Sequence, residues 1–250
     1  MKIKVNKFLE KTALKVGKKI LYYKKNNLIK TTENRKNLKT NIDLIANDIW
    51  VKDIKKKFSN VNILSEEMKT KKKIKKNWTG FIIDPIDGTR SLRDNYDSYV
   101  TQVAFIKNGE IINSVIYNPE TKEIFTNNTK FKKYNSKINS VIDNYPKPNK
   151  RLIQIIRKLK IPNYIEAGSI GYKISKVLDN TSDLFIKLNK IKLWDVAPGI
   201  LLIKKNGGSI TNKYFQEISL DQIDIHGLIV TMNIKNFNFI KKKFPKVFLV

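Results

Sequence analysis

Apolar residues recur at helical spacing in two segments near the N-terminus. The first covers residues 5–25 and the second covers residues 40–58. Residues that repeat every three to four positions lie on one face of a helix, so each segment is predicted to form an amphipathic helix. The stretch between the two segments contains Asn and Thr without a long apolar run, which indicates a loop.

After Asn60 the pattern changes to short apolar runs that are typical of strands. These strands are predicted over residues 61–64, 81–83, 99–107, 110–117 and 122–126. The third and fourth are joined by Asn108-Gly109, a dipeptide that favours a two-residue hairpin turn. The first half of the chain is therefore predicted to be a helix pair followed by a largely antiparallel sheet.

The second half alternates shorter helices and strands. Helices are predicted over residues 152–159, 169–178, 195–205 and 234–243, and strands over residues 164–167, 184–188 and 226–231. The third of these helices ends before Gly207-Gly208, a usual punctuation of helix C-termini. The fold class is therefore α/β, with helices layered on mixed sheets.

A polar segment divides the chain. Residues 127–150 contain Pro146 and Pro148 and no sustained apolar pattern, which marks a boundary. We expect residues 1–135 to form the helix pair with the antiparallel sheet, and residues 136–250 to form a C-terminal α/β half.

Composition limits the class of protein. The 250 residues carry a formal net charge of +28, and only five of the 50 basic residues are arginine. A nucleic-acid-binding protein is expected to use more arginine for bidentate contacts, so nucleic acid is an unfavoured partner. Two explanations of the large number of lysines stay open. It reflects a compositional bias of the genome, or it creates a positive electrostatic field that attracts anionic substrates.

The cellular compartment of the protein is predicted from features that the sequence lacks. No stretch approaches the roughly 18 to 20 apolar residues that cross a bilayer, so no membrane partner is expected. Cysteine is absent and the N-terminus has no secretory pattern. These features predict a cytoplasmic protein.

Three acidic clusters stand out in this basic chain. They are Ser65-Glu66-Glu67, the run from Asp84 to Thr89 (Asp-Pro-Ile-Asp-Gly-Thr), and Trp194-Asp195. Each lies where a predicted strand ends or a predicted helix begins, and α/β proteins bind ligands at such places. Each cluster alone has an ordinary explanation: a solvated pair, a capped turn, or a helix N-cap. Their conjunction favours a shared site.

The second cluster suggests the chemistry of that site. Pro85 is expected to stiffen a turn so that Asp84 and Asp87 converge, and Gly88 allows close backbone approach. The amides of Gly88 and Thr89 can face a phosphate oxygen. Two adjacent carboxylates repel each other unless cations lie between them, and magnesium is the usual cation where a substrate carries phosphate.

The three clusters, in this order and spacing, resemble the inositol monophosphatase superfamily. Its members include inositol monophosphatases, 3'(2'),5'-bisphosphate nucleotidases and some fructose-1,6-bisphosphatases. The resemblance covers nearly the whole chain and implies an αβαβα sandwich, with an N-terminal antiparallel sheet and a C-terminal mixed sheet. It also implies a phosphatase that depends on Mg²⁺ and is inhibited by lithium.

The resemblance assigns roles to individual residues. Two or three Mg²⁺ ions would be held by Glu66, Asp84, the backbone carbonyl of Ile86, Asp87 and Asp195, with Asp84 bridging two ions. Asp43 and Thr89 would act with Glu66 on the attacking water, which metal activates for in-line attack on phosphorus. Lys39 departs from the family pattern, which has an apolar residue at that position.

The resemblance also suggests a substrate. Residues 166–173 (Glu-Ala-Gly-Ser-Ile-Gly-Tyr-Lys) match the substrate-contacting segment of the family. Lys173 resembles a lysine of the bisphosphate nucleotidases, although it has an ordinary explanation as one more solvated lysine. The substrate contacts implied are Asp87, Gly88, Thr89, Gly168, Ser169, Lys173 and Asp195.

We therefore expect hydrolysis of adenosine 3',5'-bisphosphate to AMP and phosphate. Inositol 1-phosphate and fructose 1,6-bisphosphate are alternatives with the same mechanism. A basic nucleic-acid-binding protein without catalysis is the alternative of another class, and the chain contains no recognised nucleic-acid motif to support it. The sequence leaves the oligomeric state open, and a homodimer is compatible with the resemblance.

Overall fold

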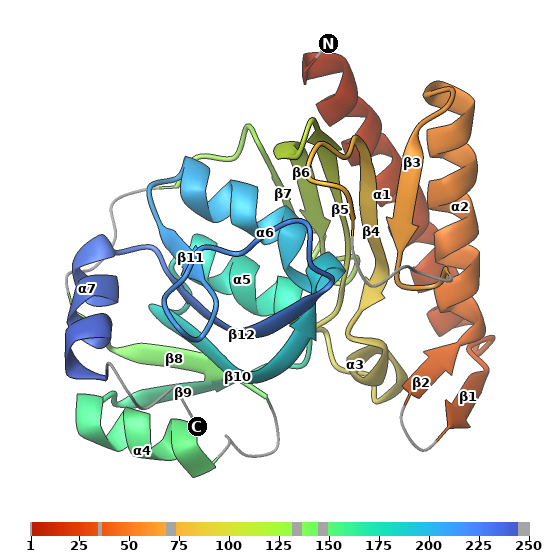
Figure 1. Cartoon of the computed structure of the whole chain (residues 1–250). Coiled ribbons are helices and arrows are strands. Elements are labelled where there is room, and N and C mark those ends of the chain that lie inside the picture. The colour runs from red at the N-terminus through yellow and green to blue at the C-terminus, as the bar shows by residue number, and fades with distance from the viewer. Residues whose placement is uncertain (1, 35–36, 69–73, 132–136, 145–149, 245–250) are drawn as a thin grey trace.

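The computed structural model describes residues 2–34, 37–68, 74–131, 137–144 and 150–244 (Figure 1). The predicted boundary between residues 135 and 136 lies outside the described residues, as do Pro146 and Pro148. The division into two halves therefore stays a prediction. No helix in these described ranges is long and apolar enough to cross a membrane.

Two long helices open the chain, as predicted. They are α1 (Lys2–Lys25) and α2 (Asn41–Lys57). The predicted loop between them is wrong, because strands β1 (Thr31–Asn34) and β2 (Asn37–Thr40) pair there as an antiparallel hairpin. These strands are four residues long and polar, so the apolar alternation that identifies a half-buried strand is absent.

The first large sheet follows the predicted meander. Its strands are β3 (Asn62–Ser65), β4 (Gly80–Asp87), β5 (Val100–Lys107), β6 (Glu110–Tyr117) and β7 (Ile124–Thr126), in spatial order. All neighbours are antiparallel except β3 and β4, which are parallel. Asn108 and Gly109 both have positive φ, 52° and 82°, as the predicted two-residue hairpin requires.

A β-bulge in β4 determines where its aspartates point. Asp84 pairs with Gln102 and Asp87 pairs with Val100, so three residue steps on β4 match two on β5. In a regular strand, residues three apart face opposite sides, but one extra residue places Asp84 and Asp87 on the same side. The segment around Pro85, which the sequence predicts to be a turn, is therefore a bulged strand. Proline is tolerated at a bulge because the bulge needs no ladder hydrogen bond from the N–H that proline lacks.

The second sheet is mixed, as predicted. It contains β8 (Ser140–Asp143), β9 (Asn163–Glu166), β10 (Leu184–Lys192), β11 (Ser209–Thr211) and β12 (Asp224–Thr231), in the spatial order β11-β12-β10-β8-β9. Strand β8 is parallel to both of its neighbours. This strand falls within residues 127–150, which the sequence predicts to be a polar boundary, because only Val141 and Ile142 in the strand are apolar.

Five layers stack in the order helix, sheet, helix, sheet, helix (Figure 1). Helices α1 and α2 cover the first sheet, and α5 (Ile170–Leu178) and α6 (Leu193–Lys205) lie between the sheets. Helices α4 (Lys150–Leu159) and α7 (Ile234–Lys243) cover the outer face of the second sheet. The expected αβαβα sandwich is confirmed.

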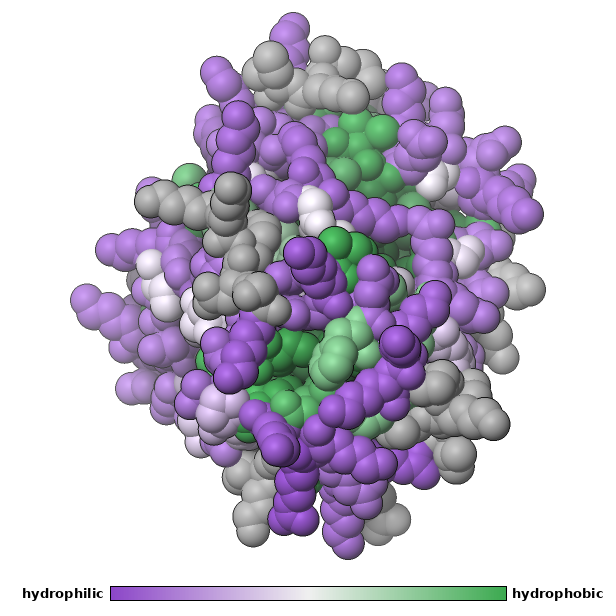
Figure 2. Space-filling view, turned by 90° about the vertical axis from the view of Figure 1, so that its left-hand side faces the viewer, coloured by the Kyte–Doolittle hydropathy of each residue, from purple (hydrophilic) through white to green (hydrophobic). Residues whose placement is uncertain are grey.

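The surface on the side of α4 and α7 is mostly hydrophilic, with apolar side chains visible in hollows between the polar ones (Figure 2). Helix α7 contributes exposed apolar side chains there, Ile234 and Phe239. Long side chains of lysine can cover apolar surface with their methylene groups while the ammonium stays in water.

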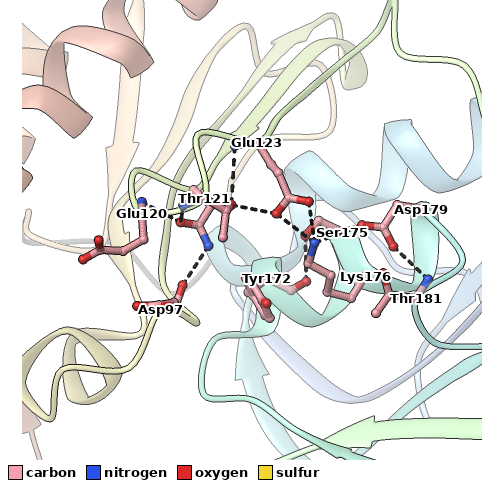
Figure 3. Close-up of polar contacts among 10 residues, drawn as sticks. Asp97, Glu120, Thr121, Glu123, Tyr172, Ser175, Lys176, Asp179 and Thr181 are labelled. Atoms are coloured by element: carbon pink, nitrogen blue, oxygen red, sulfur yellow. Dashed lines mark hydrogen bonds and ion pairs between the residues drawn. The ribbon is translucent and has the colours of Figure 1, made fainter.

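A cluster of ion pairs joins α5 to the first sheet (Figure 3). Lys176 on α5 is buried, and its ammonium group donates to both carboxylate oxygens of Glu123, at 2.7 and 2.8 Å. It also donates to Asp179 at 3.0 Å. Glu123 lies next to β7, so this cluster connects α5 to the edge of the first sheet.

Candidate active site

The acidic residues singled out in the sequence come within electrostatic reach of one another at one end of the first sheet. Glu66 follows β3, Asp84 and Asp87 lie on β4, and Asp195 lies in the first turn of α6. The charges of Glu66, Asp87 and Asp195 all act on Asp84. The sequence prediction that these clusters share one site agrees with this arrangement.

Helix N-termini surround this end of the sheet. Asp43 is the third residue of α2, Thr89 is the first residue of the short helix α3 (Thr89–Arg93), and Asp195 is the third residue of α6. Ser169 caps α5. The backbone dipoles of α2, α5 and α6 therefore favour negative charge at this place, whether it belongs to carboxylates or to a phosphate.

The side chains of Glu66 and Asp84 are coupled through a hydrogen bond between their carboxyl groups. Asp84 is 1% exposed. Burial and the neighbouring carboxylates raise the pKa of Asp84 well above its ordinary value. Glu66 keeps an exposed surface, yet desolvation of its carboxyl group, together with the charge of Glu67, raises the pKa of Glu66 to about 7.

Asp195 and Asp87 are held by backbone amides. The amide of Lys192 donates to Asp195 Oδ2 at 2.8 Å. Asp87 accepts hydrogen bonds from the amides of Ile170 and Gly171 at the start of α5. Burial raises the pKa of both aspartates, and the mutual charges raise the pKa of Asp195 further.

The residues present fit divalent cations. Asp84 Oδ1 is buried and has no hydrogen-bond partner, and it faces the charges of three further carboxylates. An oxygen-only donor set of this kind suits Mg²⁺ or Ca²⁺. Within the described residues, no three acidic or histidine side chains are gathered closely enough to hold one ion as they stand. The assignment of individual ligands, including the carbonyl of Ile86, stays a prediction.

Asp43 and Thr89 form a hydrogen-bonded pair beside this cluster. The Thr89 hydroxyl donates to Asp43 Oδ1 at 2.9 Å, and its oxygen also lies 3.3 Å from the carbonyl oxygen of Ile86. Asp43 Oδ2 accepts from the amide and the hydroxyl of Thr40, at 2.7 and 2.6 Å. Burial raises the pKa of Asp43 against the effect of these hydrogen bonds.

The turn before α5 is fastened to the first sheet. The amide of Gly168 donates to Ser98 Oγ at 2.9 Å, and the amide of Ser169 donates to the Ser98 carbonyl at 3.1 Å. Gly88, with φ 99°, packs against Ser169, where an added Cβ would approach to 3.0 Å. Gly168 and Ser169 are expected substrate contacts, but their two amides are occupied by Ser98.

Lys173 is completely buried. Its ammonium group donates to Asn144 Oδ1 and to the carbonyl of Gly168, and lies 3.9 Å from Asp143 Oδ1. Burial and the charge of Lys187 lower the pKa of Lys173 to about 7. A direct contact with substrate stays a prediction, because the ammonium group is directed at protein atoms.

Sequence reasoning missed two contacts at the site. Gln102 on β5 is fully buried and donates to Asp87 Oδ2 at 3.1 Å. Lys39 donates to Glu67 Oε2 at 2.8 Å, next to the carboxylate cluster. A polar residue inside the apolar run of β5 is the signal that could have pointed to Gln102.

Comparisons with known proteins agree with this geometry. A sequence model of the inositol monophosphatase family matches residues 2–229. The Nus factor SuhB of Xylella fastidiosa is 26% identical over 196 residues, which cover 71% of this chain and 70% of that protein. The 3'(2'),5'-bisphosphate nucleotidase CysQ of Buchnera aphidicola is 26% identical over 185 residues, 68% of this chain and 69% of that protein.

Solved structures show the same fold. An IMPase/NADP phosphatase complexed with NADP and Ca²⁺ superposes with a TM-score of 0.83 at 19% sequence identity, covering 96% of this chain and 95% of that one. The match to the family model over residues 2–229 defines the class, a metal-dependent phosphoric monoester hydrolase. The chain belongs to the inositol monophosphatase family.

Proposed function

We propose that this phosphatase hydrolyses adenosine 3',5'-bisphosphate to AMP and phosphate with two or three Mg²⁺ ions held by Glu66, Asp84, Ile86, Asp87 and Asp195. One observation supports the metal centre most directly. Asp84 Oδ1 is a buried carboxylate oxygen that has no hydrogen-bond partner, and the charges of further carboxylates act on it. Bound Mg²⁺ supplies a Lewis acid that lowers the pKa of water and offsets charge on the leaving oxygen.

The protein's own contribution to the reaction is to orient the water and remove its proton. The Thr89 hydroxyl gives its hydrogen to Asp43 Oδ1, so its lone pairs are left to accept a hydrogen from the attacking water. When Thr89 Oγ takes a proton from water, its own hydroxyl hydrogen passes to Asp43 Oδ1, so Thr89 is unchanged and Asp43 holds one more proton. The raised pKa of Asp43 makes it a stronger base than an ordinary aspartate.

The preference for a bisphosphate rests on the surroundings of Lys173. A cavity of about 180 Å³ is lined by Asp143 and Asn144, the two residues that face the Lys173 ammonium group. Its other lining residues are Lys187 and Asn189 together with the apolar Leu152, Ile186 and Leu188. Lys187 offers a cation to a second phosphate, which inositol 1-phosphate lacks. The similarity to a 3'(2'),5'-bisphosphate nucleotidase supports the same choice. Location in the cytoplasm and assembly as a homodimer stay predictions.

The test of this proposal is phosphate release from adenosine 3',5'-bisphosphate, inositol 1-phosphate and fructose 1,6-bisphosphate, measured in parallel with saturating Mg²⁺. The proposal predicts the highest kcat/KM for the nucleotide, and a loss of that preference in Lys187→Met. Preference for inositol 1-phosphate would keep the mechanism and overturn the substrate. No release from any of the three by folded protein would revive the alternative of a binding protein without catalysis.

A further inference from the structure

Gln102 places a polar side chain in the core between the sheets. It lies on β5 between Val100 and Ala104, which share its face of the sheet and pack into the apolar core against α5 and α6. Its exposed fraction is 0%. A buried amide is unfavourable unless hydrogen bonds replace those it makes with water, so its partners explain why it is tolerated.

The amide nitrogen of Gln102 joins two segments of the candidate metal centre. It donates to Asp87 Oδ2 at 3.1 Å and to the backbone carbonyl of Asp195 at 3.1 Å. Asp87 belongs to β4 of the first sheet, and Asp195 belongs to the first turn of α6. One NH₂ group therefore uses both of its hydrogens to connect the strand and the helix that carry two of the proposed ligands.

The orientation of this amide is fixed by its surroundings. Both partners are acceptors, so a flipped amide would direct its oxygen at two other oxygens. In the orientation observed, Oε1 is buried without a partner, and it faces Gly171, where an added Cβ would stand 2.5 Å away. Gly171 itself donates its amide to Asp87 Oδ2. The lack of a side chain at residue 171 leaves the space that the Gln102 amide occupies.

We propose that Gln102 is a positioning residue of the metal centre. Its NH₂ group holds the Asp87 carboxylate and the first turn of α6 at a fixed separation, so that Asp87 and Asp195 are presented together to the cations. This inference rests on the proposed role of both aspartates as metal ligands. Groups that orient metal ligands typically change metal affinity by about 10- to 100-fold when they are removed.

The test compares Gln102→Met with Thr101→Val, its neighbour on the same strand. Methionine keeps the length of the side chain and removes both donors. Thr101 is equally buried, faces the helix pair, and accepts one hydrogen bond from Trp50 Nε1 at 2.8 Å. Thr101→Val therefore removes a buried hydrogen bond of the same strand away from the metal centre, and serves as the structural control.

Two quantities are measured on each folded variant. The first is the Kd of Mg²⁺ in the absence of substrate, from titration calorimetry. The second is the pair of kinetic constants for Mg²⁺ activation and for substrate KM. We expect Gln102→Met to raise the Kd of Mg²⁺ by about 10- to 100-fold and to regain most of its kcat at high Mg²⁺. Thr101→Val is expected to keep the wild-type Kd.

The possible outcomes separate the role of Gln102 from the proposed function of the protein. A folded Gln102→Met that binds Mg²⁺ as tightly as an active wild type overturns the role of Gln102 and leaves the proposed function intact. A wild type that binds no divalent ion and releases no phosphate overturns both. If Gln102→Met does not fold, Gln102→Leu also removes both donors, and a wild-type Kd in that variant overturns the inference equally.

Discussion

Thr89 Oγ lies 2.9 Å from Asp43 Oδ1 and joins the first residue of α3 to the first turn of α2. The two residues are 46 positions apart in the chain. Thr40 fixes the other oxygen of the same carboxylate through its amide and its hydroxyl. The pair that we propose as catalytic is therefore held at a defined place by the N-terminal cap of a long helix.

Loss of the hydrogen bond between Thr89 and Asp43 is expected to lower the rate of turnover. Thr89→Val removes the hydroxyl that we propose to orient the water, and we expect kcat to fall by about 100-fold or more. Thr89→Ser keeps a hydroxyl and is expected to retain most of the activity. The measurement is steady-state phosphate release at saturating Mg²⁺. A folded Thr89→Val with the kcat of the wild type would contradict the role of this pair.

Replacing the Asp84 carboxylate should remove metal binding without lowering the stability of the metal-free protein. Asp84→Asn takes away a buried acid whose pKa is raised by burial and by Glu66, Asp87 and Asp195. We expect the metal-free variant to unfold at a Tm equal to or above that of the metal-free wild type, because the repulsion among carboxylates is relieved. Thermal unfolding in EDTA checks this. A large loss of Tm would show that Asp84 has a structural role instead.

The stabilisation by Mg²⁺ should increase with pH. In the metal-free protein, the folded state holds a proton on Glu66 up to about pH 7, whereas the unfolded chain loses it near the ordinary pKa of 4.5. The stability that this proton contributes to the metal-free protein therefore falls as pH rises between these values, and this contribution is lost above the folded pKa. Magnesium requires the ionised carboxylates, so its affinity rises over the same window.

We accordingly expect the rise in Tm caused by Mg²⁺ to be larger near pH 8 than near pH 5. Differential scanning fluorimetry with and without Mg²⁺ measures this difference directly, so general effects of pH on the +28 chain cancel. Asp84→Asn is the control, since it should show little Mg²⁺-dependent shift at either pH. A shift that is constant across this range would contradict the protonation of the cluster.

The ion cluster of Figure 3 should contribute to stability without affecting metal binding. Lys176→Met leaves Glu123 and Asp179 without their cation. Because Glu123 is partly exposed, we expect the free energy of unfolding to fall by about 1–3 kcal/mol. The exposed pair of Lys15 and Asp53 provides the control, and Lys15→Met should change stability by less than about 1 kcal/mol. Urea unfolding of both variants in EDTA makes the comparison.

Local patterns predicted the elements that bury an apolar face. The stripe Val5, Leu9, Ala13, Val16 and Ile20 of α1 is buried throughout, and its spacing is visible in the sequence. The acidic motifs could be identified because each is short and contiguous. The strands β1 and β2 could not, because they are short and their residues are mostly polar. Strand β8 could not, because only Val141 and Ile142 in it are apolar and its partners β9 and β10 lie further along the chain.

The geometry of the site depends on contacts that the sequence does not display. The side to which Asp87 points is set by a bulge, which becomes visible only when β4 is paired with β5. The burial of Lys173 depends on Asn144 and Gly168, which come from different segments. Gln102 acquires its role from Asp87 and Asp195, which meet it only in the folded chain.

The central claim is that Asp84 stands at the centre of a magnesium site that releases phosphate from a nucleotide bisphosphate. The most direct test is the initial rate of phosphate release from adenosine 3',5'-bisphosphate during a titration with Mg²⁺, for wild type and Asp84→Asn together. We predict a saturable rate that vanishes in EDTA for the wild type, and no turnover at any Mg²⁺ concentration for folded Asp84→Asn. Turnover that persists in EDTA, or in the folded variant, would contradict the claim.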